Sequence, residues 1–451
     1  MRKILVVGPS WVGDMVMAQS LFMYLKQGGE CEIDVLAPAW SLPVLARMPE
    51  VGRGVVMPLG HGQFGLGARW RLGRELAPER YDQAIVLPGS FKSALVPFFA
   101  RIPQRTGFRG EMRHGLINDM RPLDRALLPM TVQRFVALGQ PNGAAAARPA
   151  FRVPRLIADA DNQRSLAARF GLDTGRPAVA FMPGAEYGPA KQWPPAHYAE
   201  LARLLTTRGF RVWVLGAKKD SEVARPIADG NPGVLDLTGR TELGDAVDLL
   251  ALARAAVTND SGLMHVAAAL DIPLAAIFGS SSPEHTPPLG QRIAIESLRL
   301  PCAPCFARRC PQGHTRCLTG IEPARVLAAL EPFIGESPGQ ALPAQTGESP
   351  EQAPPAQTEK NPEQAPPVRA ELVEALDPPG NTLRQAQGER YCRQIQAGES
   401  PEQALPAQTG ENPEQASPVR AEPVEALDSP GDTLRQAQGE RYCPEPPKED
   451  R

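Results

Sequence analysis

The start of the chain constrains the fold most strongly, because a buried strand, a glycine-bounded loop and a helix are predicted there in direct succession. Residues 4–7 are all apolar and end at Gly8, which is typical of a strand buried on both faces of a parallel sheet. Apolar side chains then recur at helical spacing from Met15 to Leu25. Residues 8–14 are therefore expected to form a loop at the carboxyl edge of the sheet, where open α/β sheets bind ligands.

Asp14 lies at the start of this helix, where a carboxylate is favoured either as a helix cap or as part of a site. The loop is longer than capping requires, and Trp11 would be costly to expose without a use. Gly8 and Gly13 permit a tight turn and close approach of the backbone to a ligand. These features favour a site over a simple cap.

Length and charge limit the class of protein. A chain of 451 residues predicts two or three domains, and a net charge of −2 gives no basic field that would indicate a nucleic-acid partner. The apolar run at residues 4–7 is too short for a signal peptide or a membrane span. We therefore expect a soluble cytoplasmic protein whose seven Cys are reduced.

Strand and helix patterns alternate through two successive halves, which is typical of doubly wound parallel sheets. A Gly-, Pro- and Ala-rich stretch at 140–155 separates them and predicts a linker, so we expect domains at 1–150 and 151–335. In the first half the expected strands are 4–7, 31–36, 55–59 and 83–87, and the expected helices are 15–26, 41–48, 64–76 and 93–100. In the second half the expected strands are 178–182, 211–215, 234–237, 256–258 and 274–278, and the expected helices are 161–170, 197–207, 243–254, 266–270 and 323–334.

A second loop on the first sheet, at residues 88–93, contains Lys92 and leads toward a run of Arg residues. Pro103, Gly107 and Gly110 argue against one helix through this run. It is either a solvated surface loop or an anion-binding wall, and its position after the Lys92 loop favours the wall, since Arg binds phosphate in bidentate fashion. The residues concerned are Arg101, Arg105, Arg109, Arg113 and His114.

Three loops of the second half are expected to lie at one sheet edge. Residues 259–262 open a helix, whose N–H groups favour an anion, and Lys191 can meet a diphosphate as a point charge. Asp220 or Glu222 could accept hydrogen bonds from ribose hydroxyls. Taken singly, each of these residues has an ordinary structural explanation, such as a helix cap, a surface charge or, for His265, a core imidazole. Together they favour a nucleotide-diphosphate site.

Three motifs, in this order and at these separations, resemble those of the ADP-heptose:lipopolysaccharide heptosyltransferases, glycosyltransferase family 9. They are Pro9-Ser10-Trp11-Val12-Gly13-Asp14-Met15, then Pro183-Gly184-Ala185-Glu186 with Lys191 and Trp193-Pro194, and Asp260-Ser261-Gly262-Leu263-Met264-His265. The resemblance covers residues 1 to about 334 and is strongest to members that add the second heptose of the inner core. It implies a GT-B fold, in which two Rossmann-like domains face each other across a cleft.

The resemblance also implies residue roles. Asp14 matches the general base that deprotonates the acceptor hydroxyl. Donor-binding residues are then Lys191, Asp260, Ser261, Gly262 and His265, with a looser match at Glu222. Acceptor-binding residues are expected to be Ser10, Trp11, Gly13, Lys92, Arg105, Arg109 and Arg113.

This chemistry suits the residues, because a carboxylate can take the proton of a poor nucleophile while cations and helix N-termini stabilise the leaving ADP. The resemblance implies no cofactor and no bound divalent metal, and no Asp-x-Asp motif occurs in either cleft loop. It implies an ADP-heptose donor, an anionic lipopolysaccharide-core acceptor and transient contact with the inner face of the inner membrane of a Gram-negative cell. A GT-B nucleotide-sugar epimerase and a non-catalytic nucleotide-sugar binder remain alternatives.

A cluster of Cys residues with one His lies near the end of the second half. Its spacing would allow a zinc site, or a reduced loop without metal, and we do not assign a metal site to it. The cluster comprises Cys302, Cys305, Cys310, His314 and Cys317.

The composition changes after Ile334, since residues 336–451 are rich in Pro, Gln, Glu and Ala and poor in large apolar residues, which predicts a disordered tail. Two segments recur there, 367–371 as 418–422 and 383–392 as 434–443. Residues 383–390 read Leu-Arg-Gln-Ala-Gln-Gly-Glu-Arg. The reverse complement of codons for this segment can encode most of residues 368–375. We therefore interpret the tail as the translation of an inverted repeat in DNA, read through after an earlier stop codon, rather than as a module that binds a partner.

Overall fold

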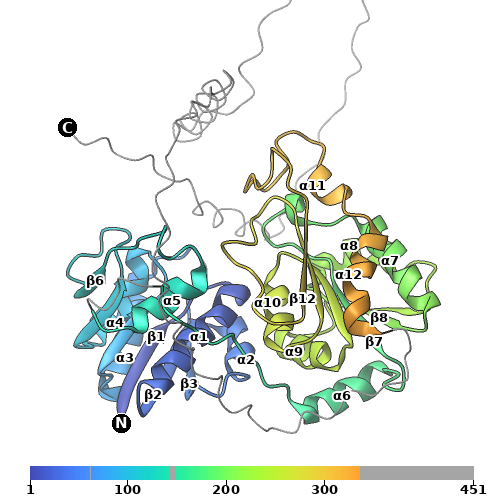
Figure 1. The fold of residues 1–451 in the computed structure, drawn as a ribbon. Helices are drawn as coiled ribbons and strands as arrows, with labels where there is room; N and C mark the ends of the chain where they lie inside the picture. Colours follow the sequence, from blue (N-terminus) through green and yellow to red (C-terminus); the bar gives the residue numbers. More distant parts are fainter. Residues whose placement is uncertain (61, 143–147, 336–451) are drawn as a thin grey trace, which may run out of the picture. The chain divides into compact units, whose positions relative to one another are not determined.

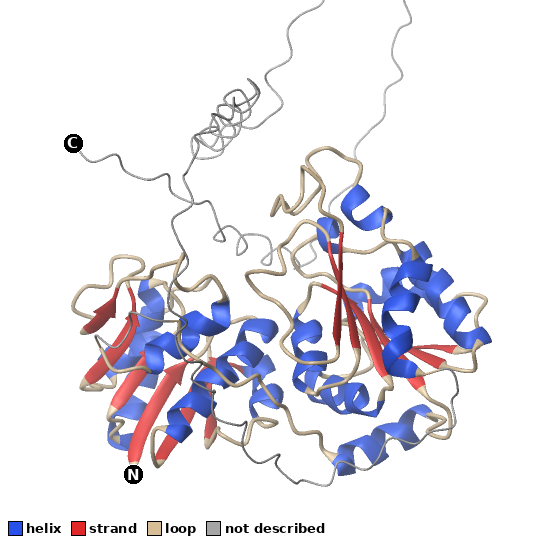
Figure 2. Cartoon of the chain, viewed as in Figure 1, coloured by secondary structure: helices blue, strands red, loops and turns tan. Residues whose placement is uncertain are grey.

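The computed structural model describes residues 1–60, 62–142 and 148–335, all of which belong to one compact unit. They contain two six-stranded sheets in which every paired strand is parallel (Figures 1 and 2). The strand orders are β3-β2-β1-β4-β5-β6 and β12-β11-β10-β7-β8-β9. Numbered along the chain within each half, both orders are 3-2-1-4-5-6, that of a Rossmann fold. The predicted doubly wound α/β architecture is confirmed.

The first half has its sheet between residues 2 and 121. Its strands are β1 (Arg2–Val7), β2 (Cys31–Pro38), β3 (Arg53–Met57), β4 (Gln83–Val86), β5 (Gln104–Phe108) and β6 (Asp119–Arg121). Its helices are α1 (Val12–Gln27), α2 (Leu42–Leu45), α3 (Leu66–Leu76), α4 (Leu95–Phe99) and α5 (Thr131–Gly139), with 3-10 turns η1 (Ala39–Ser41), η2 (Ala77–Glu79) and η3 (Phe91–Ala94).

The second half has its sheet between residues 178 and 297. Its strands are β7 (Ala178–Met182), β8 (Arg211–Val214), β9 (Val234–Asp236), β10 (Ala255–Asn259), β11 (Leu274–Phe278) and β12 (Ile293–Ser297). Its helices are α6 (Ala160–Phe170), α7 (Pro195–Thr207), α8 (Ser221–Ala228), α9 (Leu243–Leu252), α10 (Gly262–Ala269), α11 (Arg316–Thr319) and α12 (Pro323–Ile334), with 3-10 turns η4 (Pro189–Lys191) and η5 (Lys218–Asp220).

Strand β1 shows why residues 4–7 are all apolar. Its side chains alternate between two cores, since Ile4 and Val6 pack with α1 while Leu5 and Val7 pack with α3 and α4. Helices cover both faces of the sheet at these four buried positions, which leaves no place there for a polar side chain. A carboxylate placed after β1 therefore falls at the edge of the sheet, where α1 begins.

Six of the helices and strands were not predicted, namely β5, β6, α5, α8, α11 and β12. The Gly- and Pro-containing stretch at 101–113 was interpreted as a loop, but residues 104–107 pair in parallel with β4. Sheet pairing and burial override the weak local propensity of such a stretch. Helices α1 and α10 also begin earlier than expected, at Val12 and Gly262, so Asp14 lies inside the first turn of α1.

The end of the stretch predicted as a linker and the residue that follows it are fixed to the two halves. The buried Gln19 of α1 donates to the carbonyl of Arg155 at 2.6 Å and accepts from its N–H at 2.9 Å. Leu156 N–H donates to the carbonyl of Ala269 at the end of α10 at 2.9 Å. A buried ion pair, Arg47 with Asp248 at 2.5 Å, further links the segment just after α2 to α9.

One hydrophobic core contains residues from both halves, including Met15 of α1 and Val266 of α10. The domain boundary near residue 150 remains a prediction, because the described residues form a single unit. The tail predicted to be disordered lies outside the described residues. Among those that are described, no helix has the length and apolar character needed to cross a membrane.

Candidate functional site

The carboxyl edge of the first sheet carries the loop that contains Asp14. Strands β2 and β3 lie on one side of β1, and strands β4, β5 and β6 lie on the other. The strand order therefore changes direction between β1 and β4, and such a switch point is where open α/β sheets bind ligands. The loops after β1 and β4 flank this point. Trp11 is the N-cap residue of α1, with no capping hydrogen bond from its side chain, and Asp14 is three residues further on and half-buried. The N-cap position of α1 is thus not held by Asp14.

The loop after β4 is braced by the loop after β5. Phe91 N–H donates to the Glu111 carboxylate at 2.6 Å, and Glu111 N–H donates to the carbonyl of Gly89 at 3.1 Å. A Cβ at Gly110 would overlap the Gly89 carbonyl, so this close approach requires glycine. Lys92 is half-buried at the end of the braced loop.

The Arg run does not form one wall, because β5 passes through it. Arg105 pairs with Ala84 near the amino end of β5, whereas Arg109 follows the carboxyl end and is exposed. Arg113 is fully buried and donates to the carbonyls of Pro88 at 2.7 Å and Phe108. Of the three predicted acceptor-binding Arg residues, only Arg109 is exposed at the Asp14 edge. The structure puts Arg105 at the other edge and leaves no exposed surface on Arg113.

In the second half, Lys191 and Asp260 meet at the corresponding switch point, between β7 and β10. Lys191 Nζ donates to Asp260 Oδ2 at 2.5 Å, and both side chains are largely shielded from solvent. The pair joins η4, which follows β7, to the turn before α10. A cation is thereby held beside the N-terminus of α10, which favours an anion there.

Asn259, fully buried at the end of β10, holds these two loops in register. Its amide nitrogen donates to the carbonyl of Pro183 at 2.6 Å, and its amide oxygen accepts from Trp193 N–H at 3.0 Å. The Tyr198 hydroxyl donates to the same oxygen at 3.2 Å. No separate role was predicted for Asn259, although an Asn at the end of a buried strand indicates a side chain that holds neighbouring loops by hydrogen bonds.

His265 and Gly262 bring the N-terminus of α10 against that of α1. Burial lowers the pKa of His265 to about 4, so its imidazole is neutral at neutral pH. A Cβ at Gly13 would overlap Cδ2 of His265, and one at Gly262 would lie 2.8 Å from Cβ of Val12. At each of these contacts the backbone of a glycine in one helix packs against a side chain of the other helix. Asp14 and Ser261, which are each half-buried, are the sequence neighbours of Gly13 and Gly262.

The acidic side chains after β8 occupy different environments. Asp220 accepts from the N–H of Ala217 at 2.9 Å, and its carboxylate would contact a Cβ at either Gly184 or Gly216. Glu222 is exposed in the first turn of α8. Asp220 thus lies against the loop after β7, which the sequence motifs did not show, while Glu222 remains the predicted ribose-binding residue.

An aromatic contact in the second half also escaped prediction. The Tyr187 ring has Lys191 Nζ at 5.1 Å and the Arg308 guanidinium at 5.3 Å from its centroid. Its hydroxyl donates to the carbonyl of Phe306 at 2.7 Å, and Ala190 N–H donates to that of Arg308 at 3.1 Å. The segment that contains the Cys cluster thus packs on the Lys191 loop and adds a second cation to it.

The Cys cluster itself is only partly assembled. Cys302 Sγ lies 4.0 Å from His314 Nε2, and backbone N–H groups of residues 312–315 lower the pKa of the Cys310 thiol. Over the described ranges, no three His, Cys, Asp or Glu side chains are arranged to hold a metal ion. Without such an arrangement we assign no metal ligand.

Comparisons with known proteins agree with the observed fold. The model of "Glycosyltransferase family 9 (heptosyltransferase)" matches residues 69–316. Lipopolysaccharide heptosyltransferase 2 of Salmonella typhimurium is 48% identical over 344 residues, which are 74% of this chain and 99% of that protein. Lipooligosaccharide heptosyltransferase 2 of Haemophilus influenzae is 48% identical over 305 residues, 65% of this chain and 88% of that protein. A solved structure, that of Escherichia coli ADP-heptose lps heptosyltransferase II, is 45% identical, with a TM-score of 0.67 over 74% of this chain and 98% of that one.

Proposed function

The chain belongs to glycosyltransferase family 9, the heptosyltransferases, and we propose that it moves heptose from ADP-L-glycero-D-manno-heptose to the first heptose of the lipopolysaccharide inner core. One observation carries the proposal. The N-terminus of α1, which bears Asp14, packs directly on the N-terminus of α10, through Gly13 and His265. This contact brings the switch-point site with Asp14, which suits a general base, next to the switch-point site with Lys191, which suits a diphosphate.

On the acceptor side, Asp14 acts as the general base. A sugar hydroxyl is a weak nucleophile, and a carboxylate within hydrogen-bond reach removes its proton as the new glycosidic bond forms. The loop residues Ser10, Trp11 and Gly13 set the path by which the acceptor reaches Asp14. Helix α1 supports this role because it is buried around most of its surface and cannot easily shift.

On the donor side, Lys191 and the N–H groups at Ser261 and Gly262 stabilise the charge that develops on ADP as it leaves. Asp260 fixes Lys191 at the helix N-terminus through their 2.5 Å contact. Arg308 is a second cation for the diphosphate, since it flanks the same Tyr187 ring. Glu222 binds the ribose. Asn259 positions the two donor loops rather than touching the nucleotide.

The acceptor is anionic, so cations near the Asp14 edge are expected to bind it. Lys92 and Arg109 fill this role, whereas the buried Arg113 positions the loop after β4 through its bonds to backbone carbonyls. Because the acceptor is a glycolipid, the protein works at the inner face of the inner membrane and contacts that surface transiently.

The experiment is product analysis with the full-length chain. ADP-heptose is supplied with and without a lipopolysaccharide truncated after the first heptose, and both ADP release and acceptor mass are followed. A transferase adds one heptose to the acceptor and releases one equivalent of ADP only when acceptor is present. Conversion of the donor without acceptor would indicate the epimerase alternative, and unchanged donor with bound ADP-heptose would indicate a binder.

A further inference from the structure

The outer face of α3 and α4 exposes large apolar side chains that no described element covers. Leu66, Trp70 and Phe98 are 49%, 51% and 41% exposed, although the opposite face of the same helices is buried against the sheet through Leu72, Leu76 and Val96. Leu66, Trp70 and Arg74 recur every four residues, so they lie on one side of α3. Figure 1 shows α3 and α4 next to each other on the first sheet. An exposed apolar surface on helices whose other face is already buried is typical of an interaction site.

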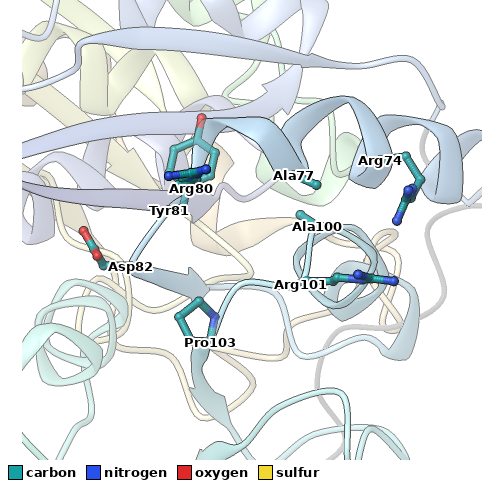
Figure 3. Close-up of a pocket in the computed structure, with 8 residues that line it drawn as sticks. All are labelled: Arg74, Ala77, Arg80, Tyr81, Asp82, Ala100, Arg101 and Pro103. Carbon is teal, nitrogen blue, oxygen red and sulfur yellow. The ribbon is translucent and has the colours of Figure 1, made fainter.

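Arginines surround these apolar side chains. Arg71, Arg74 and Arg101 are exposed, and the Arg105 guanidinium lies over the Phe98 ring, 5.7 Å from its centroid. Arg74, Arg80 and Arg101 line an open hollow of about 510 Å³ between the end of α3 and the residues after α4. Figure 3 shows Arg74 and Arg101 on the same side of this hollow. The exposed acidic groups here are Glu75 and Asp82, so positive charge prevails.

The same surface continues to the acceptor loop. The Phe64 ring, just before α3, stacks on Phe91 with centroids 6.4 Å apart, and Phe91 directly precedes Lys92. Met112, in the loop that braces residues 88–93, is 86% exposed. An apolar and basic surface therefore extends from the proposed acceptor site along α3 to the opposite edge of the sheet.

We propose that this surface, the docking face (Leu66, Trp70, Arg71, Arg74, Phe98 and Arg101), binds an anionic lipid bilayer. Aromatic and aliphatic side chains enter the interface between headgroups and acyl chains, and the arginines contact lipid phosphates. The proposal rests on the proposed function, because it gives the acceptor loop a fixed place at the membrane that holds the acceptor. It also gives a role to Arg101 and Arg105, which lie before and near the amino end of β5, at the edge of the sheet opposite Asp14.

The test is flotation of the full-length chain with vesicles of phosphatidylglycerol and phosphatidylcholine, compared with phosphatidylcholine alone. The chain is expected to bind only the anionic vesicles. It should dissociate from them at about 1 M salt, where the Debye length is only ~3 Å. Charge reversal in Arg74→Glu with Arg101→Glu should reduce binding by about 20-fold or more, since each Arg near an anionic surface contributes about fivefold. Trp70→Ser with Phe98→Ser should reduce binding at every salt concentration at which the wild type still binds.

Matched controls lie on other surfaces. Trp40→Ser removes an equally exposed Trp, and Arg169→Glu with Arg225→Glu reverses two exposed charges of the second half, so both should bind vesicles as the wild type does. Transfer to a water-soluble, deacylated acceptor is measured for every variant and should not change. The proposal would be overturned if the wild-type protein does not float with anionic vesicles, or if the docking-face variants bind them as the controls do. Absence of transfer to the soluble acceptor would instead refute the proposed function and leave the vesicle result standing.

Discussion

Replacing Gly13 by Ala tests the contact between α1 and α10. The added Cβ would overlap Cδ2 of His265 and come within 3.1 Å of Nε2 and 3.3 Å of Cγ. His265 is only 6% exposed, so the ring has little room to move away. Either the imidazole leaves its rotamer or α1 moves away from α10, carrying Asp14 with it.

The cost to stability is small, and the cost to turnover is large. Overpacking a tight site costs about 1–3 kcal/mol. Ala is favoured over Gly inside a helix by about 1 kcal/mol. The two together predict a net loss of roughly 0–2 kcal/mol in the free energy of unfolding. A displacement of about 1 Å in a catalytic group costs on the order of 100-fold in rate. We therefore expect kcat for heptose transfer to fall about 100-fold in a chain that remains folded.

Steady-state transfer, urea unfolding and ADP calorimetry are measured together on this variant. Gly67→Ala is the matched control, because it also lies in the first turn of a helix and a Cβ there would meet nothing within 4 Å. The control should be fully active and at least as stable as the wild type. If Gly13→Ala turns over like the wild type with unchanged ADP affinity, the contact between α1 and α10 does not set the geometry of the site.

The remaining predictions concern the donor site, pH and the tail. Lys191→Ala should weaken ADP binding in calorimetry by about 1.5–3 kcal/mol, since a charge-assisted contact is lost; unchanged affinity would remove Lys191 from the site. Burial lowers the pKa of His265 from 6.5 to about 4, so the unfolded chain binds its proton first as the pH falls. Stability should therefore decline from about pH 6.5 down to about pH 4, by no more than ~3 kcal/mol, and a His265→Gln variant should lose this part of the pH dependence in urea unfolding. A chain ending at Gly335 keeps α12, whose Val326, Leu327 and Leu330 are buried, and should match the full-length chain in melting temperature and transfer; a large loss of either would give the tail a role.

The central frame of the fold could be predicted from the sequence because it depends on local patterns. The apolar run at 4–7, the loop to Asp14 and the apolar spacing of α1 are read directly, and the same holds for β7, β10 and the turn before α10. Parallel strands bring their carboxyl ends to one edge, so the chain order of these motifs was enough to place Asp14, Lys191 and Asp260 at the carboxyl edges of their sheets.

What could not be predicted depends on pairing between distant segments. Strand β5 has glycine and polar residues and forms because β4 offers it an edge. A strand rises about 3.3 Å per residue, so Arg105 and Arg109 lie about 13 Å apart along β5 rather than on one surface. The burial of Arg113 and the approach of Arg308 to Tyr187 are likewise tertiary, since no spacing in the sequence links those residues.

The most direct test of the account is the turnover of Asp14→Asn measured beside its affinity for ADP. Asparagine keeps the size of the side chain and removes its ability to take a proton. Transfer of heptose to the truncated lipopolysaccharide should fall by a factor of about 100 to 10,000, the usual contribution of a general base, while ADP binding and melting temperature stay at wild-type values. Asp229→Asn, which alters an exposed carboxylate at the end of α8, should have no effect on any of the three. An Asp14→Asn enzyme that transfers heptose at a near-normal rate would contradict the assignment of the base to α1.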